Sequence, residues 1–256
     1  MIDIHCHILP NVDDGAKHME GSVQMAKFAV SQGITTIVAT PHHLNGRYEN
    51  YKIDIIENVK ALNQRLHEEN LPITILPGQE TRINGEMTTD LENGHLLPLN
   101  ETSGYLFVEL PSNHVPRYTK RLLHDLKLAG VKPIIVHPER NKEIIENPDL
   151  LYDIVLEGTL TQVTAASVTG QFGKKVKKFT HQLINANLTH FVASDAHNVT
   201  NRGFMMQEAH RTIRQEMGEA MSEWMIDNAQ LLLDGEKIVG EEPMPIKKRK
   251  ILGIFS

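Results

Sequence analysis

Short runs of apolar, often β-branched residues alternate with longer amphipathic stretches along most of this 256-residue chain. The predicted strands are Met1–Cys6, Ile34–Thr40, Ile73–Pro77, Tyr105–Leu110, Pro133–Val136, Thr161–Thr164 and His190–Ala193. The predicted helices are Gly21–Gln32, Ile53–Asn70, Arg117–Ala129, Glu139–Leu156, Lys174–Asn187, Gly203–Gly218 and Ala220–Leu233. This alternation is typical of α/β proteins with a parallel sheet. Seven such units favour a closed or nearly closed TIM-like β/α barrel over a doubly wound sheet. A doubly wound sheet should carry a Gly-rich phosphate loop after its first strand, and this sequence has no such loop there.

Residues 1–240 show no linker, so we expect one domain over this range. Residues 84–102 are predicted to be a long irregular loop within it. Residues 241–256 differ, with two prolines followed by a basic and apolar run, and we expect them to form a flexible C-terminal tail. An alternative is a weak contact of this tail with an anionic membrane surface or a partner.

Charge and cysteine content exclude several classes of protein. The chain has 26 Lys and Arg against 32 Asp and Glu, which gives a formal net charge of −6 and argues against a specific nucleic-acid partner. A single cysteine excludes a disulfide scaffold and a four-cysteine zinc site. Neither a signal peptide nor a membrane-spanning run is visible, so we expect a cytoplasmic location. The 14 histidines are unusual and raise the question of where they lie.

Six of the seven predicted strands end on, or just before, a histidine or an acidic residue. These residues are His5, His7, His42, Glu80, Glu109, His137, Asp195 and His197, and Asp14 follows in the loop after the first strand. The carboxyl ends of barrel strands converge on one mouth, so these side chains are expected to meet there. Each of them alone has an ordinary alternative, such as a helix cap, an ion pair or a buried core histidine.

As a set, these residues predict a metal-dependent hydrolase. Carboxylates and imidazoles that share a buried mouth need compensating cations. Nitrogen and oxygen ligands without a thiolate suit Mn, Fe, Zn or Mg, and such ions assist hydrolysis. Arg140 and Arg202 lie just after predicted ligands and are suited to phosphate binding, although either can also be an ordinary loop arginine. Arg47 is a weaker third candidate.

The ordered words DIHCHILPNVDDGA, ATPHH, GQE, VHPER and SDAHN resemble the polymerase-and-histidinol-phosphatase (PHP) superfamily. Within it, the chain is similar from Met1 to about Leu233 to the tyrosine-protein phosphatases encoded with capsule and exopolysaccharide genes in Gram-positive bacteria. The resemblance implies the PHP fold, a distorted seven-stranded (β/α)7 barrel with three metal ions, usually Mn.

The resemblance also implies a role for each matched residue. One metal would be held by His5, His7, Glu80 and Asp195, a second by Glu80, Glu109 and His137, and a third by Asp14, His42 and His197. Arg140 and Arg202 would bind phosphate and stabilise the transition state, and a metal-bridging hydroxide would be the nucleophile.

The cysteine-dependent mechanism of other tyrosine phosphatases is excluded. It needs a Cys-x5-Arg loop, but six residues after Cys6, the only cysteine, stands Val12. A phenolic leaving group, with a pKa of about 10, needs less help from a general acid than an alkyl alcohol, so a metal site without an evident acid suits phosphotyrosine. His43 is a possible proton donor, although an exposed bystander is the simpler interpretation.

The resemblance implies a protein-tyrosine phosphatase that acts on a bacterial tyrosine kinase and other tyrosine-phosphorylated proteins and regulates exopolysaccharide or capsule synthesis. Three other hypotheses stay open: a small-molecule phosphoesterase of the histidinol-phosphatase type, a nuclease of the same superfamily, and a non-catalytic module that binds phosphoproteins. The acidic net charge counts against the nuclease.

Overall fold

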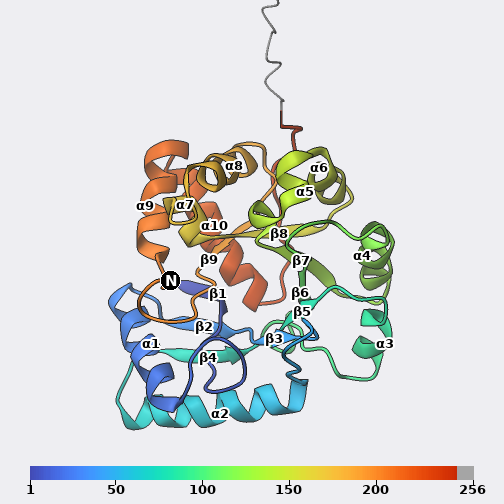
Figure 1. Ribbon diagram of the computed structural model, residues 1–256. Helices are drawn as coiled ribbons and strands as arrows, with labels where there is room; N and C mark the ends of the chain where they lie inside the picture. Colours follow the sequence, from blue (N-terminus) through green and yellow to red (C-terminus); the bar gives the residue numbers. More distant parts are fainter. Residues whose placement is uncertain (247–256) are drawn as a thin grey trace, which may run out of the picture.

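The computed structural model describes residues 1–246, in which parallel strands are surrounded by helices (Figure 1). The strands are β1 (Ile2–Cys6), β2 (Thr36–Ala39), β3 (His42–His43), β4 (Thr74–Pro77), β5 (Glu80–Arg82), β6 (Tyr105–Glu109), β7 (Lys132–Val136), β8 (Leu160–Thr164) and β9 (Phe191–Ala193). The helices are α1 (Met19–Ser31), α2 (Lys52–Glu68), α3 (Met87–Glu92), α4 (Thr119–Leu128), the 3-10 helix η1 (Pro138–Arg140), α5 (Lys142–Glu146), α6 (Asp149–Leu156), α7 (Ala165–Thr169), α8 (Lys174–Asn185), α9 (Met206–Met217) and α10 (Glu219–Leu233).

The strands form two parallel sheets, with the orders β1-β2-β4 and β3-β5-β6-β7-β8-β9. β3 follows β2 after the break at Thr40–Pro41, and β5 follows β4 after Gly78–Gln79. The parallel α/β fold that the sequence predicts is therefore present, but residues 1–246 do not form one continuous closed sheet. The outer edges approach each other, since the backbone of Cys6 pairs with that of Ala196 beyond β9.

Two apolar layers hold the strands in place. On β6, Leu106 and Val108 belong to the large cluster that packs against the helices, and Phe107 belongs to a smaller inner cluster. Ala229 and Leu232 of α10 join the inner cluster, and α10 packs against β1 and β9. The inner face of β6 changes from apolar Phe107 to acidic Glu109 at its carboxyl end, which is where the polar cluster begins.

All seven predicted strand segments have a counterpart, and most helix ends differ from the prediction by one or two residues. The short helix α7 was not predicted, and three further regions differ more strongly. The predicted helix Glu139–Leu156 is interrupted, because Pro148 has no N–H to continue α5, and a new helix, α6, begins after it. The predicted irregular loop 84–102 contains α3. The predicted helix Gly203–Gly218 begins only at Met206, after Met205 adopts a left-handed conformation with φ 52°.

The chain stays in contact with the domain beyond the predicted boundary at residue 240. The Met244 N–H donates to the Ala186 carbonyl at 2.8 Å, and Asn187 donates to the Glu242 carbonyl at 3.1 Å. Ile246 packs against the large apolar cluster. Residues 247–256, which make up most of the predicted flexible tail, lie outside the described residues. Among residues 1–246, no helix has the length and apolarity that a membrane span requires.

Candidate metal centre and active site

The structure brings the nine predicted metal ligands together at the carboxyl ends of the strands. They are His5 on β1, His7 and Asp14 in the loop that follows, His42 on β3, Glu80 on β5, Glu109 on β6, His137 after β7, and Asp195 and His197 after β9. Parallel strands end at the same edge, so residues far apart in the sequence meet there. The prediction that these side chains converge is in agreement with the structure.

Glu80 lies at the centre of the cluster and is fully buried. Its Oε2 lies 3.6 Å from His5 Nε2, 3.4 Å from His7 Nε2 and 2.7 Å from His42 Nδ1. Its Oε1 lies 2.8 Å from His137 Nε2. The register between β3 and β5 pairs His42 directly with Glu80, which explains their short distance.

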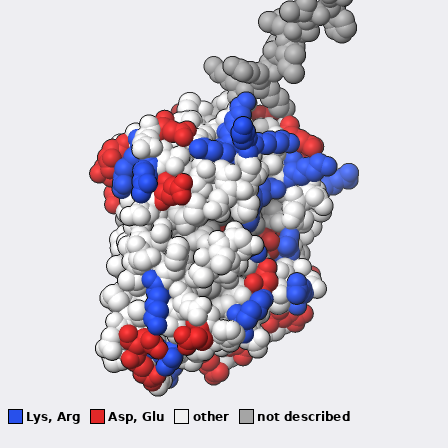
Figure 2. Space-filling view, turned by 60° about the vertical axis from the view of Figure 1, so that its left-hand side comes forward, with Lys and Arg blue, Asp and Glu red and all other residues white. Residues whose placement is uncertain are grey.

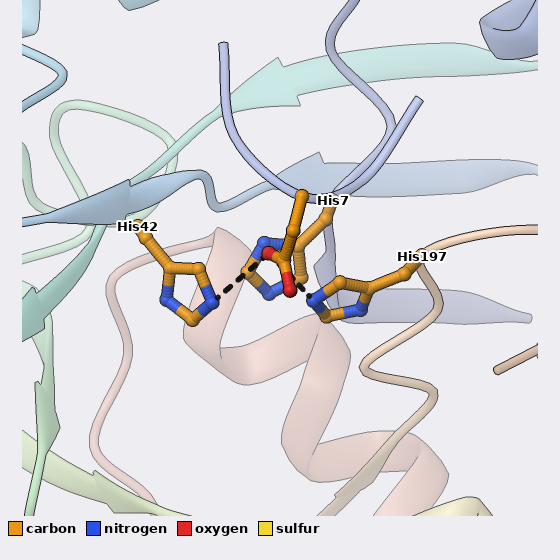
Figure 3. A group of neighbouring side chains, drawn as sticks. His7, His42 and His197 are labelled. Carbon is orange, nitrogen blue, oxygen red and sulfur yellow. Dashed lines mark ion pairs between the residues drawn. The ribbon is translucent and has the colours of Figure 1, made fainter. Parts of the chain in front are cut away.

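Asp14 is the second point of convergence (Figure 3). Its Oδ1 lies 3.4 Å from His42 Nε2 and 3.4 Å from His197 Nε2, the two ion pairs drawn as dashed lines in Figure 3. The rings of His7 and His197 are stacked with centroids 3.8 Å apart. Three imidazoles from three separate segments thus surround one carboxylate.

The ligand atoms fall into three overlapping groups, each within 4.8 Å, that have the composition of metal sites. The groups are His7, Asp14, His42 and His197; His5, His7 and Glu80; and His42, Glu80 and Glu109.

This grouping differs from the predicted partition. His42 lies beside Glu80 and Glu109 as well as Asp14, because β3 pairs with β5. His7 joins the Asp14 group through its stacking on His197. His137 contacts Glu80 but belongs to none of the three groups, and Asp195 Oδ1 lies 3.3 Å from His7 Nε2 without joining them.

Several buried polar atoms of this cluster have no hydrogen-bond partner among residues 1–246. They are Asp14 Oδ1, His42 Nδ1, Glu80 Oε2, Glu109 Oε2 and His197 Nε2. His42 Nδ1 and Glu80 Oε2 approach each other without hydrogen-bond geometry. Burying unsatisfied polar atoms is costly, and cations that accept their lone pairs would remove that cost. The donor set therefore fits divalent metal ions.

The electrostatics of the cluster point the same way. Burial opposes protonation of His42, but the Glu80 carboxylate raises the pKa of His42 to about 10. Burial and the charge of Glu80 raise the pKa of Glu109 to about 7. Burial lowers the pKa of His137 and that of His197 to about 4. Without a cation, the negative charge of the buried carboxylates must be compensated by protons bound to some of the ligands. The remaining ligand atoms then keep lone pairs that no donor within residues 1–246 satisfies.

Both predicted arginines reach the cluster. Arg140 Nη2 lies 2.8 Å from Asp195 Oδ2, and Arg202 Nη1 lies 3.2 Å from Asp14 Oδ2. Both line a cavity of about 250 Å³ that also has His42, Glu109, Ser112, His137 and Asp195 in its walls. Arg47, the weaker candidate, lies over the ring of Tyr48 at 5.0 Å and does not line this cavity.

Sequence reasoning missed three residues that orient the ligands. Asp13 Oδ2 lies 2.6 Å from His7 Nδ1, Gln162 Oε1 lies 2.8 Å from His5 Nδ1, and Arg82 Nη2 lies 3.0 Å from Glu109 Oε1. Such partners fix the ring and carboxylate orientations that a metal requires. The position of Asp13 next to the predicted ligand Asp14 is a signal that could have identified it. Gln162 lies within a predicted strand, and no feature of the sequence distinguishes it from the other polar residues of that strand.

His43 is not the exposed bystander that the sequence suggested. It is fully buried, its Nδ1 accepts a hydrogen bond from the Asn50 N–H at 3.1 Å, and burial lowers its pKa. Its contacts are those of a structural residue, so they do not support a role as proton donor.

The fold and the cluster together have the form of a metal-dependent hydrolase, with ligands and arginines gathered at the ends of parallel strands. A family model described as "Capsular polysaccharide synthesis, CpsB/CapC" matches residues 1–234. The chain is 51% identical to the tyrosine-protein phosphatase YwqE of Bacillus subtilis, over the full length of both chains. It is 39% identical to the putative tyrosine-protein phosphatase CapC of Staphylococcus aureus, again over both full lengths.

A solved structure gives the same result. It is described as one of the crystal structures of YwqE from Bacillus subtilis and CpsB from Streptococcus pneumoniae, "unique metal-dependent tyrosine phosphatases". The two folds superimpose with a TM-score of 0.94 at 50% identity, covering 97% of this chain and 100% of the other. The protein belongs to the CpsB/CapC family.

Proposed function

We propose that this protein is a metal-dependent protein-tyrosine phosphatase that regulates capsule or exopolysaccharide synthesis. The observation that carries the proposal is the buried cluster of imidazoles and carboxylates, several of whose atoms have no hydrogen-bond partner within residues 1–246, beside two arginines in one cavity. The printed names of the relatives YwqE and CapC and the description of the YwqE structure as metal-dependent support it.

The three ligand groups are the proposed metal sites, and three Mn ions are the proposed occupants, with Fe, Zn or Mg as alternatives. The ligands would come from the nine clustered residues, with Glu80, His7 and His42 contributing to more than one site. When bound, the ions would supply positive charge and a water of lowered pKa.

The chain's own contribution is to bind and orient the phosphate. Arg140 and Arg202 are the proposed catalytic residues, because guanidinium groups match phosphate oxygens in geometry and charge. Leu110, Pro111 and Val136 give the cavity an apolar part that suits the phenyl ring of a phosphotyrosine. Asp195 holds Arg140 through the 2.8 Å ion pair, so the guanidinium is positioned before substrate arrives.

We propose that the chain is a PHP-superfamily member, and that its two sheets are parts of a distorted seven-stranded barrel whose edges meet at Cys6 and Ala196. We also propose a cytoplasmic location, one domain over residues 1–240, and a tyrosine-phosphorylated kinase among its substrates. A membrane or partner contact of residues 241–256 is a further hypothesis.

Turnover of a phosphotyrosine peptide and of para-nitrophenyl phosphate tests the proposed function. Both activities should disappear when a chelator removes the metals and return when Mn is added to the dialysed protein. Histidinol phosphate should be a poorer substrate than the peptide by kcat/KM. Undiminished turnover in the presence of the chelator would overturn the metal-dependent assignment.

A further inference from the structure

Phe172 and the lysines of α8 form an aromatic and basic surface near the cavity. The proposed mechanism gives no role to these residues. Phe172 lies in the loop between α7 and α8 and is 39% exposed although it is a large apolar residue. The guanidinium carbon of Arg140 lies 5.5 Å from the centroid of its ring. A cation against an aromatic face is attracted to it, so Phe172 connects the phosphate-binding arginine with the outer surface.

Four lysines follow Phe172 on the first half of α8: Lys174, Lys175, Lys177 and Lys178. Lys177 forms an ion pair with Glu216 at 3.6 Å, and no ion pair of the other three is found with any residue in 1–246. The opposite face of α8 is apolar and buried through Phe179, Leu183 and Ile184. Lysines three or four residues apart on a helix repel one another, so this cluster does not stabilise the fold.

The helix that carries the lysines is a neighbour of one wall of the cavity. α8 packs against η1, and η1 is the turn that carries Arg140. Figure 2 shows basic side chains gathered toward the top of the molecule, at the level where Figure 1 places α8. A substrate segment that leaves the cavity past Arg140 would therefore meet Phe172 and then these lysines.

We propose that Phe172, Lys174, Lys175 and Lys178 form a docking surface for acidic residues that flank the phosphotyrosine of a protein substrate. This inference rests on the proposed function and specifies its substrate class as acidic phosphotyrosine segments. Charge complementarity favours such a segment, because unpaired cations raise the association rate and the specificity for an anionic partner. An anionic membrane surface has the same charge, but the contact between Phe172 and the cavity-lining Arg140 favours the peptide.

Two phosphotyrosine peptides of equal length test the surface, one with Asp and Glu around the phosphotyrosine and one with Asn and Gln. The variant Lys174→Gln/Lys175→Gln/Lys178→Gln should lose about tenfold in kcat/KM for the acidic peptide at low ionic strength, and under about twofold for the neutral peptide. Para-nitrophenyl phosphate, which does not reach the lysines, should be turned over as by the wild type. The matched control is Lys60→Gln/Arg121→Gln/Lys237→Gln, which removes the same charge from exposed positions on other parts of the surface.

Each outcome decides the proposal. Equal losses for both peptides, an equal loss in the control variant, or no loss at all would overturn it. Loss of binding to vesicles of anionic phospholipid, with unchanged preference between the peptides, would assign the surface to a membrane and also overturn it. Binding of the labelled acidic peptide, measured by fluorescence anisotropy, tests the surface separately from the proposed function. If the wild type shows no turnover, the phosphatase is refuted, but weaker peptide binding by the lysine variant still supports the docking surface.

Discussion

At the scale of single residues, Glu80 determines the arrangement of the candidate site. It is fully buried and lies within 3.6 Å of four imidazoles, from β1, the loop after β1, β3 and the turn after β7. A fully buried carboxylate stays ionised only when positive charge nearby compensates the loss of its hydration. The positions of the imidazoles are in turn set by partners farther from the centre, such as Asp13 at His7 and Gln162 at His5.

Replacing Asp13 by asparagine should weaken metal binding without unfolding the protein. The Asp13 carboxylate lies 2.6 Å from His7 Nδ1, which keeps a proton on Nδ1 and leaves Nε2 free for a metal. The neutral amide of Asp13→Asn holds the ring less strongly, so Mn affinity measured by calorimetry should fall about 10- to 100-fold. Asp153→Asn, at an exposed ion pair with Lys120, is the control and should bind Mn as the wild type does. Wild-type affinity in Asp13→Asn would contradict the prediction.

Replacing Arg140 by alanine should reduce turnover much more than metal content. Its guanidinium lines the cavity and is the proposed phosphate ligand, so kcat/KM for a phosphotyrosine peptide should fall about 100- to 1000-fold. Arg140→Lys should recover only part of the activity, because an ammonium group cannot bind two phosphate oxygens side by side. Metal analysis of both variants is essential because Arg140 also contacts Asp195. Unchanged kinetics in Arg140→Ala would remove its assigned role.

At the scale of elements, short breaks in the strands position the ligands. β2 and β4 end before the site, and β3 and β5 resume after Thr40–Pro41 and Gly78–Gln79. The second pair of strands brings His42 next to Glu80. The loop after β1 folds back in a similar way, since the Ala16 N–H donates to the His7 carbonyl at 3.2 Å. Asp13 and Asp14 reach the imidazoles because of this close return.

Gly15→Ala should disrupt that loop. A β-carbon at Gly15 would lie 2.0 Å from the His7 carbonyl oxygen and 2.7 Å from His7 Cβ, so the backbone itself must move. We expect a loss of about 2 kcal/mol or more in the free energy of unfolding. Metal content should fall as well, because Asp14 moves with the loop. The readouts are urea denaturation and metal analysis.

Gly85→Ala is the matched control for this substitution. Among residues 1–246, no atom lies within 4 Å of a β-carbon at Gly85, and the Gly85 backbone conformation does not require glycine. Its stability and metal content should match those of the wild type. If Gly15→Ala behaves like Gly85→Ala, the tight return of the loop is not needed to hold Asp13 and Asp14.

Much of this arrangement could be predicted from local sequence. The features that could not be predicted depend on contacts between residues that are far apart in the chain. Strands such as β6 have apolar runs that identify them, and polar residues at their ends mark the site. Gln162 was not predicted because its role depends on reaching His5, which is 157 residues away in the chain. The break before α6 was missed because the helical periodicity of residues 139–156 was given more weight than Pro148, which has no N–H to continue a helix. α3 was missed because the polar composition of residues 84–102 indicates a loop, whereas in the folded protein Met87 is buried and a short helix forms there.

At the scale of the whole molecule, the net charge of −6 is partly a local property. Four of the acidic residues, Asp14, Glu80, Glu109 and Asp195, lie in one cluster and are the proposed metal ligands. The metal-free protein must compensate these charges with protons and with Arg140 and Arg202. Metal binding is therefore expected to exchange cations for protons, and this exchange is measurable.

Mn binding to the metal-free protein should release protons. Glu80 raises the pKa of His42 to about 10, and burial together with Glu80 raises the pKa of Glu109 to about 7. His42 is thus protonated at pH 7 to 8 and Glu109 increasingly so as the pH falls, whereas metal ligands must be deprotonated. Calorimetry in buffers with different ionisation enthalpies should detect about one to two protons released, and affinity should fall about tenfold or more for each unit of pH below 7.

The variant Glu109→Gln is the control for this exchange, because its amide at position 109 carries no titratable proton. It should release fewer protons than the wild type, and its Mn affinity should depend less steeply on pH between 6 and 8, even if the affinity itself is lower. The wild type should also gain thermal stability on Mn addition, by less at pH 6 than at pH 8, since the gain follows the affinity. Identical heats in all buffers and a pH-independent affinity would mean that the acidic cluster does not exchange protons for metal.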